Sequence, residues 1–229
     1  METEKKLKKK TKVKIIPLLT ALFIILILGI AIYFLSLLPI SNIFISGNNY
    51  LTDQEIIEIA KIDDYPSFIK TTKYRIKKRL LKNSYIKEVN VKKKWFNTIE
   101  INIKEKNILF RKDENKIIVL EDGTELDDKL LYDVPILLNY VPDTKYDSFI
   151  KHMNKINESV KTEISEIRYY PNDQDDDRFL LHMNDGNLVY LTLTKFSQIN
   201  YYEDVLDQLE GKKGILYLDS GNHFKVMDY

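Results

Sequence analysis

The chain has 229 residues, of which 35 are Lys or Arg, 34 are Asp or Glu, and none is Cys. The lack of Cys excludes a disulfide scaffold, a thiolate zinc site and a Cys nucleophile, and the 44% of hydrophobic residues excludes a disordered chain. The net charge of +1 is unevenly distributed: residues 1–14 carry +5, residues 15–52 carry none, residues 53–106 carry +6 and residues 107–229 carry −10. This segregation indicates a chain organised around a membrane.

The first predicted element is a membrane-spanning helix over residues 15–38, a run of 24 uncharged and mostly apolar residues. At a rise of about 1.5 Å per residue this helix measures about 36 Å, enough to cross a hydrocarbon core about 30 Å thick. Pro17 fits the first helical turn, and Pro39 marks the end. A cleavable signal peptide is the alternative. It needs a shorter apolar core and a small-x-small cleavage site, and residues 36–38 offer none.

Seven Lys residues precede this segment, within a predicted cytoplasmic tail of residues 1–14. Because positively charged flanks stay on the cytoplasmic side, we expect the N-terminus inside and the residues from about 43 onward outside the cell membrane. A nucleic-acid-binding arm is the alternative, but the position of these lysines directly beside the span favours a role in topology. The sequence therefore predicts a single-pass membrane protein whose bulk is extracytoplasmic.

Residues 43–106 predict a small domain with the element order β-α-α-β-β. A strand is expected at residues 43–46, and a capping box at residues 52–55 starts the first helix. A second helix is expected from residue 71 or 72 to about residue 82, and two strands with alternating polarity follow, around a turn at residues 96–97. Ile76, Leu80 and Leu81 of the second helix are expected to face inward. The other apolar positions of these elements are Ile56, Ile59, Ala60, Val89, Val91, Ile99, Ile101 and Ile103.

This domain resembles the POTRA domain of the FtsQ/DivIB family of bacterial cell division proteins. The resemblance rests on its place directly after a single span and on two motifs, Ile43-Phe44-Ile45-Ser46-Gly47-Asn48 and Val89-x-Val91 followed by Trp95-Phe96-Asn97-Thr98-Ile99-x-Ile101-x-Ile103-x-Glu105. Members of the family often have Pro where Phe96 stands here.

Basic residues are concentrated in this domain. Two interpretations are open: a solvated helix face, or an attraction to anionic lipid or to a wall polymer near the membrane. Nucleic acid is excluded as a ligand because the domain is expected outside the cell. The residues concerned are Lys70, Lys73, Arg75, Lys77, Lys78, Arg79, Lys82, Lys92, Lys93 and Lys94.

The distal segment, residues 107–229, predicts an α+β domain with an antiparallel sheet and two helices. Strands are expected at residues 117–121, 164–170, 179–183, 188–193, 215–218 and 224–227, with an extended piece at 134–138. Phe149, Met153, Ile156 and Val160 are spaced to form one face of a helix, and Ile199, Tyr202, Leu206 and Leu209 indicate another helix, which Gly211 ends.

The distal segment is also similar to the β domain of DivIB-type family members from Gram-positive bacteria. The residues that carry this similarity are Met183-Asn184-Asp185-Gly186-Asn187, Ile199-Asn200-Tyr201-Tyr202 and Gly211-Lys212-Lys213-Gly214-Ile215. With both domains, the resemblance covers nearly the whole chain.

The sequence predicts no catalytic, cofactor-binding or metal site. The three His residues, His152, His182 and His223, do not have the spacing of metal ligands. Residues 173–177 are similar to the start of a calcium-binding loop. However, Arg178 and Asn184 stand where such a loop has Gly and Glu, so a solvated acidic loop is favoured. We therefore expect no enzymatic activity and no cofactor.

The resemblance implies a non-catalytic scaffold of the divisome, located at the septum, which joins FtsL and DivIC/FtsB-type single-span partners and helps to regulate septal peptidoglycan synthesis. Two alternatives are a POTRA-containing secretion or assembly component, which would usually carry several POTRA repeats or a barrel, and an extracytoplasmic enzyme. The missing catalytic motifs disfavour the enzyme.

The last strand is the predicted site of partner binding. A terminal strand often lies at a sheet edge, where its main-chain groups are available to a partner strand. The resemblance implies the same place, since FtsQ relatives receive their FtsB-type partner at this strand beside an Asp-Ser-Gly turn, here Asp219-Ser220-Gly221. The candidate contact residues are Leu218, Ser220, Phe224 and Val226. The alternative is that Phe224 and Val226 are core residues.

Overall fold

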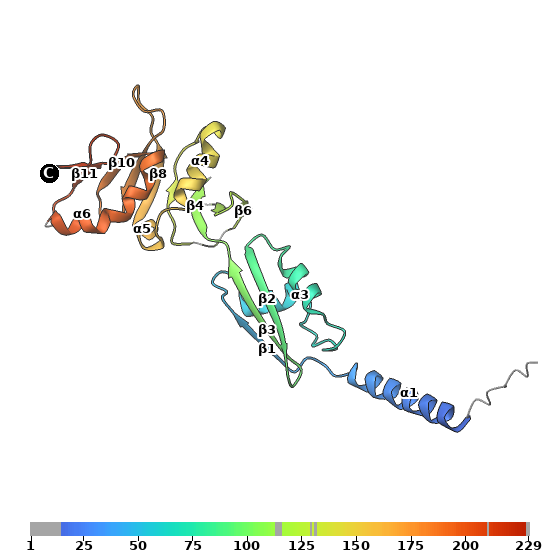
Figure 1. Cartoon of the computed structure of the whole chain (residues 1–229). Coiled ribbons are helices and arrows are strands. Elements are labelled where there is room, and N and C mark those ends of the chain that lie inside the picture. Colours follow the sequence, from blue (N-terminus) through green and yellow to red (C-terminus); the bar gives the residue numbers. More distant parts are fainter. Residues whose placement is uncertain (1–14, 113–115, 129, 131, 210, 228–229) are drawn as a thin grey trace, which may run out of the picture. The chain divides into compact units, whose positions relative to one another are not determined.

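The computed structural model describes residues 15–112, 116–128, 130, 132–209 and 211–227 (Figure 1). The predicted cytoplasmic tail, residues 1–14, lies outside the described residues. The chain divides into two compact units, Met1–Lys104 and Glu105–Tyr229. Each unit has its own hydrophobic core, and each is described by itself.

The first unit begins with α1 (Ile15–Leu35), a helix that is long and apolar enough to cross a membrane. The helix ends three residues before the predicted Leu38. Two causes are visible: the hydroxyl of Ser36 donates to the carbonyl oxygen of Tyr33, and the carbonyl oxygen of Leu38 accepts from the main-chain N–H of Phe68 at 2.9 Å. Pro39 also disfavours a helical conformation of the residue before it.

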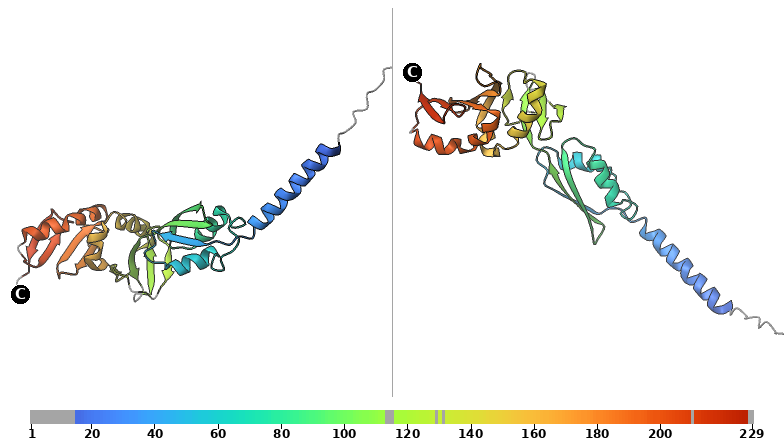
Figure 2. Two further views of the ribbon diagram at one scale, coloured as in Figure 1. Left: turned by 90° about the horizontal axis from the view of Figure 1, so that it is seen from below. Right: turned by 45° about the horizontal axis from the view of Figure 1, so that its top comes forward.

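The rest of the first unit has the predicted order β-α-α-β-β (Figure 2). Its sheet has the strand order β1-β3-β2, in which β1 and β3 run parallel. The elements are β1 (Asn42–Ser46), α2 (Asp53–Ala60), α3 (Lys73–Leu80), β2 (Ile86–Lys94) and β3 (Thr98–Glu105).

Local sequence signals account for these elements. The capping box is confirmed, because Thr52 accepts from the N–H of Glu55 while the Glu55 carboxylate accepts from the N–H of Thr52. The alternation in β3 is confirmed as well, since Ile99, Ile101 and Ile103 are buried against the two helices. The prediction for Leu81 is wrong. This residue is the C-cap of α3 and is 43% exposed.

The second unit is an α+β fold around a nine-stranded sheet. Its strands are β4 (Ile108–Lys112), β5 (Ile117–Leu120), β6 (Glu125–Asp127), β7 (Ile136–Leu137), β8 (Ile164–Tyr169), β9 (Arg178–Met183), β10 (Leu188–Thr192), β11 (Gly214–Tyr217) and β12 (His223–Val226). Its helices are α4 (Asp143–Met153), α5 (Glu158–Thr162), the 3₁₀ helix η1 (Leu193–Tyr201) and α6 (Tyr202–Gln208).

The sheet is mixed, whereas the sequence predicted an antiparallel one. The strand order is β12-β11-β10-β9-β8-β7-β4-β5-β6, and the pairs β10–β11, β7–β8 and β4–β7 are parallel. Between β10 and β11 the chain crosses over through η1 and α6, and between β7 and β8 it crosses over through α4 and α5. Parallel neighbours require crossovers of this kind.

The helices also differ from the prediction. The apolar face of residues 149–160 belongs to two helices, because the chain leaves the helical path at Asn154 and re-enters it at Glu158. The side-chain amide of Asn154 donates to the carbonyl oxygens of Ile150 and Glu121, which stabilises the break. The four predicted residues of this face are nevertheless buried, so the core was identified correctly. At its centre, Phe149 stacks on Phe179 with the ring centroids 5.0 Å apart.

Candidate partner-binding edge

Strand β12 is the terminal strand of the nine-stranded sheet, and its open side defines the candidate site. It pairs antiparallel with β11, with Val226 opposite Gly214 and Lys225 opposite Ile215. The N–H of Gly214 donates to the side chain of Asn187 at 2.8 Å rather than to β12, so Gly214 and Val226 form a non-hydrogen-bonded pair. Hydrogen-bonded and non-hydrogen-bonded pairs alternate along an antiparallel ladder. The main-chain groups of Phe224 and Val226 therefore point away from β11.

The four predicted contact residues lie together at this end of the sheet, but in different environments. Leu218 is buried, with 6% exposure, and belongs to the core. Phe224 is half-buried, packs against the same core, and has its ring over Gly214. Ser220 is exposed in the turn, and Val226 is 45% exposed. The core interpretation thus holds for the side chain of Phe224, whereas the side chain of Val226 is accessible.

A groove of about 490 Å³ lies beside β12. Helix α6 and the end of η1 form one wall, and β11, the following turn and β12 form the other. The lining residues are Gln198, Tyr201, Tyr202, Val205, Gln208, Leu209, Leu216, Leu218, Asn222 and Phe224. Two predicted contact residues, Leu218 and Phe224, therefore shape this groove.

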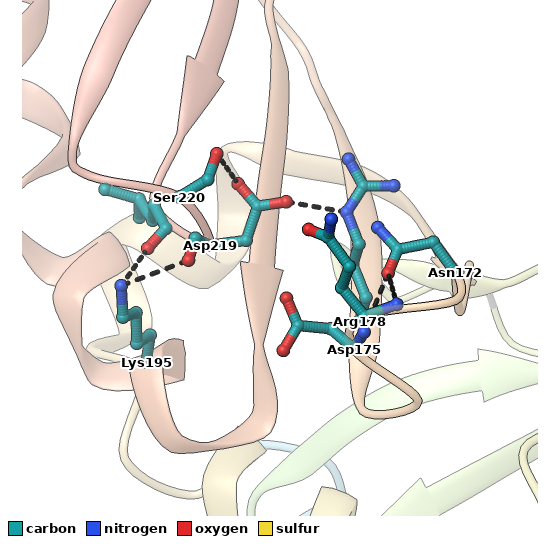
Figure 3. Close-up of polar contacts among 8 residues, drawn as sticks. Asn172, Asp175, Arg178, Lys195, Asp219 and Ser220 are labelled. Atoms are coloured by element: carbon teal, nitrogen blue, oxygen red, sulfur yellow. Dashed lines mark hydrogen bonds and ion pairs between the residues drawn. The ribbon is translucent and has the colours of Figure 1, made fainter.

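Two basic side chains hold the turn between β11 and β12 (Figure 3). Arg178, at the start of β9, donates from Nε to Oδ2 of Asp219 at 2.6 Å, and the two side chains are only 10% and 5% exposed. Lys195, in η1, donates from Nζ to the carbonyl oxygens of Leu218 and Asp219 at 2.7 and 3.3 Å. Ser220 donates its hydroxyl to the other carboxylate oxygen of Asp219. The turn is thus tied to two elements outside the β11–β12 hairpin.

Aromatic rings connect the Arg178 side chain to β12 across the sheet. Its guanidinium lies 3.7 Å from the ring centroid of Tyr190. Tyr190 stacks on Tyr217 with centroids 5.4 Å apart, and Tyr217 stacks on His223 at 4.8 Å. Because Val189 points into the core, its neighbour Tyr190 projects from the opposite face. This row of rings aligns three strands at the edge of the sheet.

Asn187 fixes the start of β11. It is fully buried, donates from Nδ2 to Asp185 and to the hydroxyl of Tyr202, and accepts from the N–H of Gly214. Burial raises the pKa of Tyr202, and the neighbouring Asp185 carboxylate raises it further, so the phenol remains a neutral donor. This network sets the register at which β11, and therefore β12, joins the sheet.

Sequence reasoning missed Arg178, Lys195 and the role of Asn187. One signal was available for Arg178, because this charged residue begins a strand whose next three residues, 179–181, are apolar. For Lys195 no local signal exists, because its partners lie 23 and 24 residues further along the chain.

Other polar groups show no arrangement for metal binding among the described residues. Nδ1 of His152 lies 2.7 Å from the carbonyl oxygen of Ser148, in its own helix. The acidic loop of residues 173–177 is partly paired, because Lys145 contacts Asp176 at 2.8 Å and Asp177 at 2.6 Å. These hydrogen bonds raise the pKa of Lys145 and keep it charged.

The basic residues of the first unit mostly face solvent, and two of them, Arg79 and Lys93, are half-buried. Arg79 donates from Nη1 to the carbonyl oxygen of Ala60 at 2.7 Å, so it caps the end of α2. Lys93 is half-buried; it donates to the carbonyl oxygen of Phe68, and its Nζ lies 4.3 Å from the centroid of that ring.

Known proteins are similar in sequence to most of this chain. The family described as "POTRA domain, FtsQ-type" matches residues 38–106. The cell division protein DivIB of Listeria monocytogenes is 31% identical over 230 residues, covering 96% of this chain and 85% of the relative. DivIB of Bacillus anthracis is 31% identical, covering 98% and 87%, and DivIB of Bacillus subtilis is 30% identical, covering 89% and 80%. A solved structure of the major extracytoplasmic domain of DivIB from Geobacillus stearothermophilus aligns with 47% of this chain and 96% of its own length, at 22% identity and a TM-score of 0.39.

An apolar helix of membrane-spanning length, a POTRA domain and a mixed α+β unit define a class of single-pass membrane proteins with an extracytoplasmic POTRA domain. Within this class, the chain belongs to the FtsQ/DivIB family of bacterial cell division proteins. Its relatives' shared name supports a role in the division machinery.

Proposed function

We propose that this protein is a non-catalytic scaffold of the bacterial divisome that acts at the division septum. Residues 1–14 form its cytoplasmic tail, residues 15–38 its anchor, residues 43–106 the POTRA domain and residues 107–229 the β domain. The extracytoplasmic part binds FtsL-like and DivIC/FtsB-like single-span partners and thereby helps to regulate septal peptidoglycan synthesis. For the basic face of the POTRA domain, anionic lipid and a wall polymer are the proposed ligands.

The observation that supports a docking role is the open side of β12. Its outward main-chain groups belong to Phe224 and Val226, and the side chain of Phe224 also lines the groove described above. In strand addition, main-chain hydrogen bonds supply affinity, and pockets for alternate side chains supply specificity. The edge and the groove together provide both parts of such a site.

The predicted contact residues take different roles in this proposal. Val226 and Ser220 are accessible and contact the partner directly. Leu218 and Phe224 form part of the groove wall, so their replacement alters the shape of the site as well as the stability of the core.

The ladder register gives a sharp test with two proline substitutions. Val226→Pro removes an N–H that points outward to the partner, while leaving the hydrogen bonds between β11 and β12 intact. We expect capture of the DivIC/FtsB-like partner by the full-length protein in membranes to fall at least about tenfold, which corresponds to about 1.4 kcal/mol. The melting temperature should change little.

Lys225→Pro is the matched control, because the N–H of Lys225 faces Ile215 inside the ladder. This substitution should lower the melting temperature clearly. Unchanged capture by Val226→Pro would place the partner elsewhere. If Val226→Pro lowers the melting temperature as much as Lys225→Pro does, the N–H of Val226 does not point outward.

The septal role is tested in cells. Depletion of the protein should produce filaments with unfinished septa, and a fluorescent fusion should collect at midcell. A Val226→Pro fusion should reach the membrane at normal levels and fail to complement the depletion.

A further inference from the structure

The turn between β2 and β3 exposes two large aromatic side chains. Trp95 and Phe96 are each 88% exposed, more than any other large hydrophobic side chain in the described part of the chain. They stand at the tip of the hairpin, where the polypeptide reverses direction between Lys94 and Thr98. A contiguous patch of exposed apolar side chains is typical of an interaction surface.

The backbone of this turn is strained at Phe96, although the Phe96 side chain is 88% exposed and so adds little to the packing of the fold. Phe96 and Asn97 have φ angles of 59° and 51°, in the left-handed region that Gly and Asn adopt most readily. A positive φ is a genuine outlier for a bulky residue such as Phe. Gly at position 96 would relieve the strain, so the ring of Phe96 serves a purpose outside the fold.

The hairpin tip lies close to the place where the chain leaves the membrane. Strands β1 and β3 are parallel, with Asn42 opposite Thr98, so the turn and the start of β1 occupy the same end of the sheet (Figure 1). The N–H of Ser41 donates to the carbonyl oxygen of Asn97 at 2.9 Å. Helix α1 ends at Leu35, and six residues span at most about 20 Å. Asn97, in the turn, is therefore within about 25 Å of the end of the apolar helix.

The loop of residues 65–69 contacts the linker that follows α1. The hydroxyl of Ser67 donates to the carbonyl oxygen of Ser36 at 2.6 Å, and the N–H of Phe68 donates to that of Leu38. In the same loop Tyr65 and Ile69 are 54% and 49% exposed. The aromatic tip thus belongs to a wider apolar end of the POTRA domain that faces the linker from α1.

Lysines flank this apolar end. Lys93 contacts the loop through Phe68: its Nζ donates to the Phe68 carbonyl oxygen and lies 4.3 Å from the centroid of the Phe68 ring. Burial lowers the pKa of Lys93, and the charge of Lys73 lowers it further. Lys70 follows the exposed Ile69, and Lys94 precedes Trp95. Tryptophan at the headgroup level with lysine beside it is the composition found at membrane interfaces.

We propose that the Trp95–Phe96 tip inserts into the extracytoplasmic interface of the same membrane that α1 crosses, with the flanking lysines against anionic headgroups. The POTRA domain then has two attachments to the bilayer, the covalent linker and the hairpin, and these fix its orientation on the membrane. The inference rests on α1 spanning the membrane and is independent of partner docking at β12.

Trp95 is the single Trp of the chain, so the tryptophan fluorescence of the unmodified protein comes from the tip alone. The full-length protein is reconstituted in vesicles of phosphatidylcholine and phosphatidylglycerol, some of which carry brominated acyl chains. We expect blue-shifted emission that bromines near the headgroup quench strongly and bromines near the chain ends quench weakly. Emission that brominated lipid leaves unchanged and aqueous iodide quenches fully would overturn the proposal.

The matched control moves the reporter along the same strand. In the double variant Trp95→Phe, Lys104→Trp, the Trp lies six residues beyond Thr98, about 20 Å further along β3. This variant should show red-shifted emission and no quenching by brominated lipid. Equal quenching at both positions would contradict insertion of the tip.

Phe96→Gly separates a membrane role from a structural one. Glycine adopts positive φ without strain, so the thermal stability should be unchanged or higher. The quenching of Trp95 by brominated lipid should decrease. A clear loss of stability would show that the ring supports the fold and would refute the argument from strain.

Two further experiments distinguish lipid from protein as the ligand of the tip. Replacement of phosphatidylglycerol by phosphatidylcholine, or the variant Lys70→Gln, Lys94→Gln, should weaken quenching if the lysines contact anionic headgroups. If Trp95 stays in water in vesicles and its emission shifts only after an FtsL-like or DivIC-like partner is added, the tip binds protein, and the lipid proposal is wrong.

Discussion

Nε of Arg178 donates to Oδ2 of Asp219 at 2.6 Å, and this contact joins the start of β9 to the turn before β12. Both side chains are at least nine-tenths buried, and the guanidinium also lies against the ring of Tyr190. A buried ion pair of this kind is costly to break, because the remaining charge is left without a partner. The pair therefore makes the conformation of the turn depend on a residue 41 positions away in the sequence.

The first prediction concerns this pair. Asp219→Ala should lower the free energy of unfolding of the second unit by about 3–5 kcal/mol, because it leaves the Arg178 guanidinium buried and unpaired. Ser220→Ala, one residue away and exposed, should cost about 0–0.5 kcal/mol. Urea unfolding measures both. Similar losses for the two variants would mean that the turn, rather than the ion pair, sets the stability.

The second prediction concerns the POTRA core. Ile101 is 1% exposed in the middle of β3, so Ile101→Asp should destabilise the domain by several kcal/mol, because it buries an unpaired carboxylate. Glu100, on the opposite face, contacts Lys94 at 3.3 Å with both side chains well exposed. Glu100→Ala should therefore cost about 0–0.5 kcal/mol. Thermal melting distinguishes the two, and a reversed order would contradict the burial pattern of β3.

Local signals predicted much of the fold. The capping box at Thr52 and the alternation at Ile99, Ile101 and Ile103 depend on residues at most four positions apart, and the structure confirms both. The pairing of β10 with β11 could not be read in the same way, because it depends on how η1 and α6 pack. The break at Asn154 was hidden as well, since the apolar spacing continues through it.

The candidate site was predicted in part for the same reason. Its edge position follows from the order of the chain, because β12 is the last predicted strand and has a single neighbour in the sheet. The contacts that shape it are long-range. Arg178 reaches Asp219 across 41 residues and Asn187 reaches Gly214 across 27, and neither distance leaves a periodic pattern in the sequence. The difference between accessible Val226 and buried Leu218 emerges only from packing.

The third prediction concerns topology. The seven Lys before the apolar helix should keep the N-terminus in the cytoplasm. In intact cells whose wall has been removed, external protease should digest the residues after 43 and leave an N-terminal reporter whole. Loss of the reporter without lysis would reverse the orientation. The control is a detergent-treated sample, in which the reporter must become accessible.

The last prediction concerns Asn187, which ties β11 to β10 and to the first residue of α6. Asn187→Ala removes the acceptor of the buried Gly214 N–H and the amide donor shared by Asp185 and Tyr202. A buried polar group that loses its partner costs about 1–3 kcal/mol, so Asn187→Ala should lower the free energy of unfolding by about 2–3 kcal/mol.

Asn184 offers the matched control, because it is exposed and makes a single side-chain hydrogen bond, to the carbonyl oxygen of Thr162. Asn184→Ala should cost no more than about 0.5–1.5 kcal/mol. Because Asn187 also sets the register of β11, its replacement should weaken partner capture at β12 even below the melting temperature, whereas Asn184→Ala should leave capture unchanged. Full capture by a folded Asn187→Ala protein would show that the edge of the sheet keeps its position without this network, and the register would then have to come from the row of rings that Tyr190, Tyr217 and His223 form.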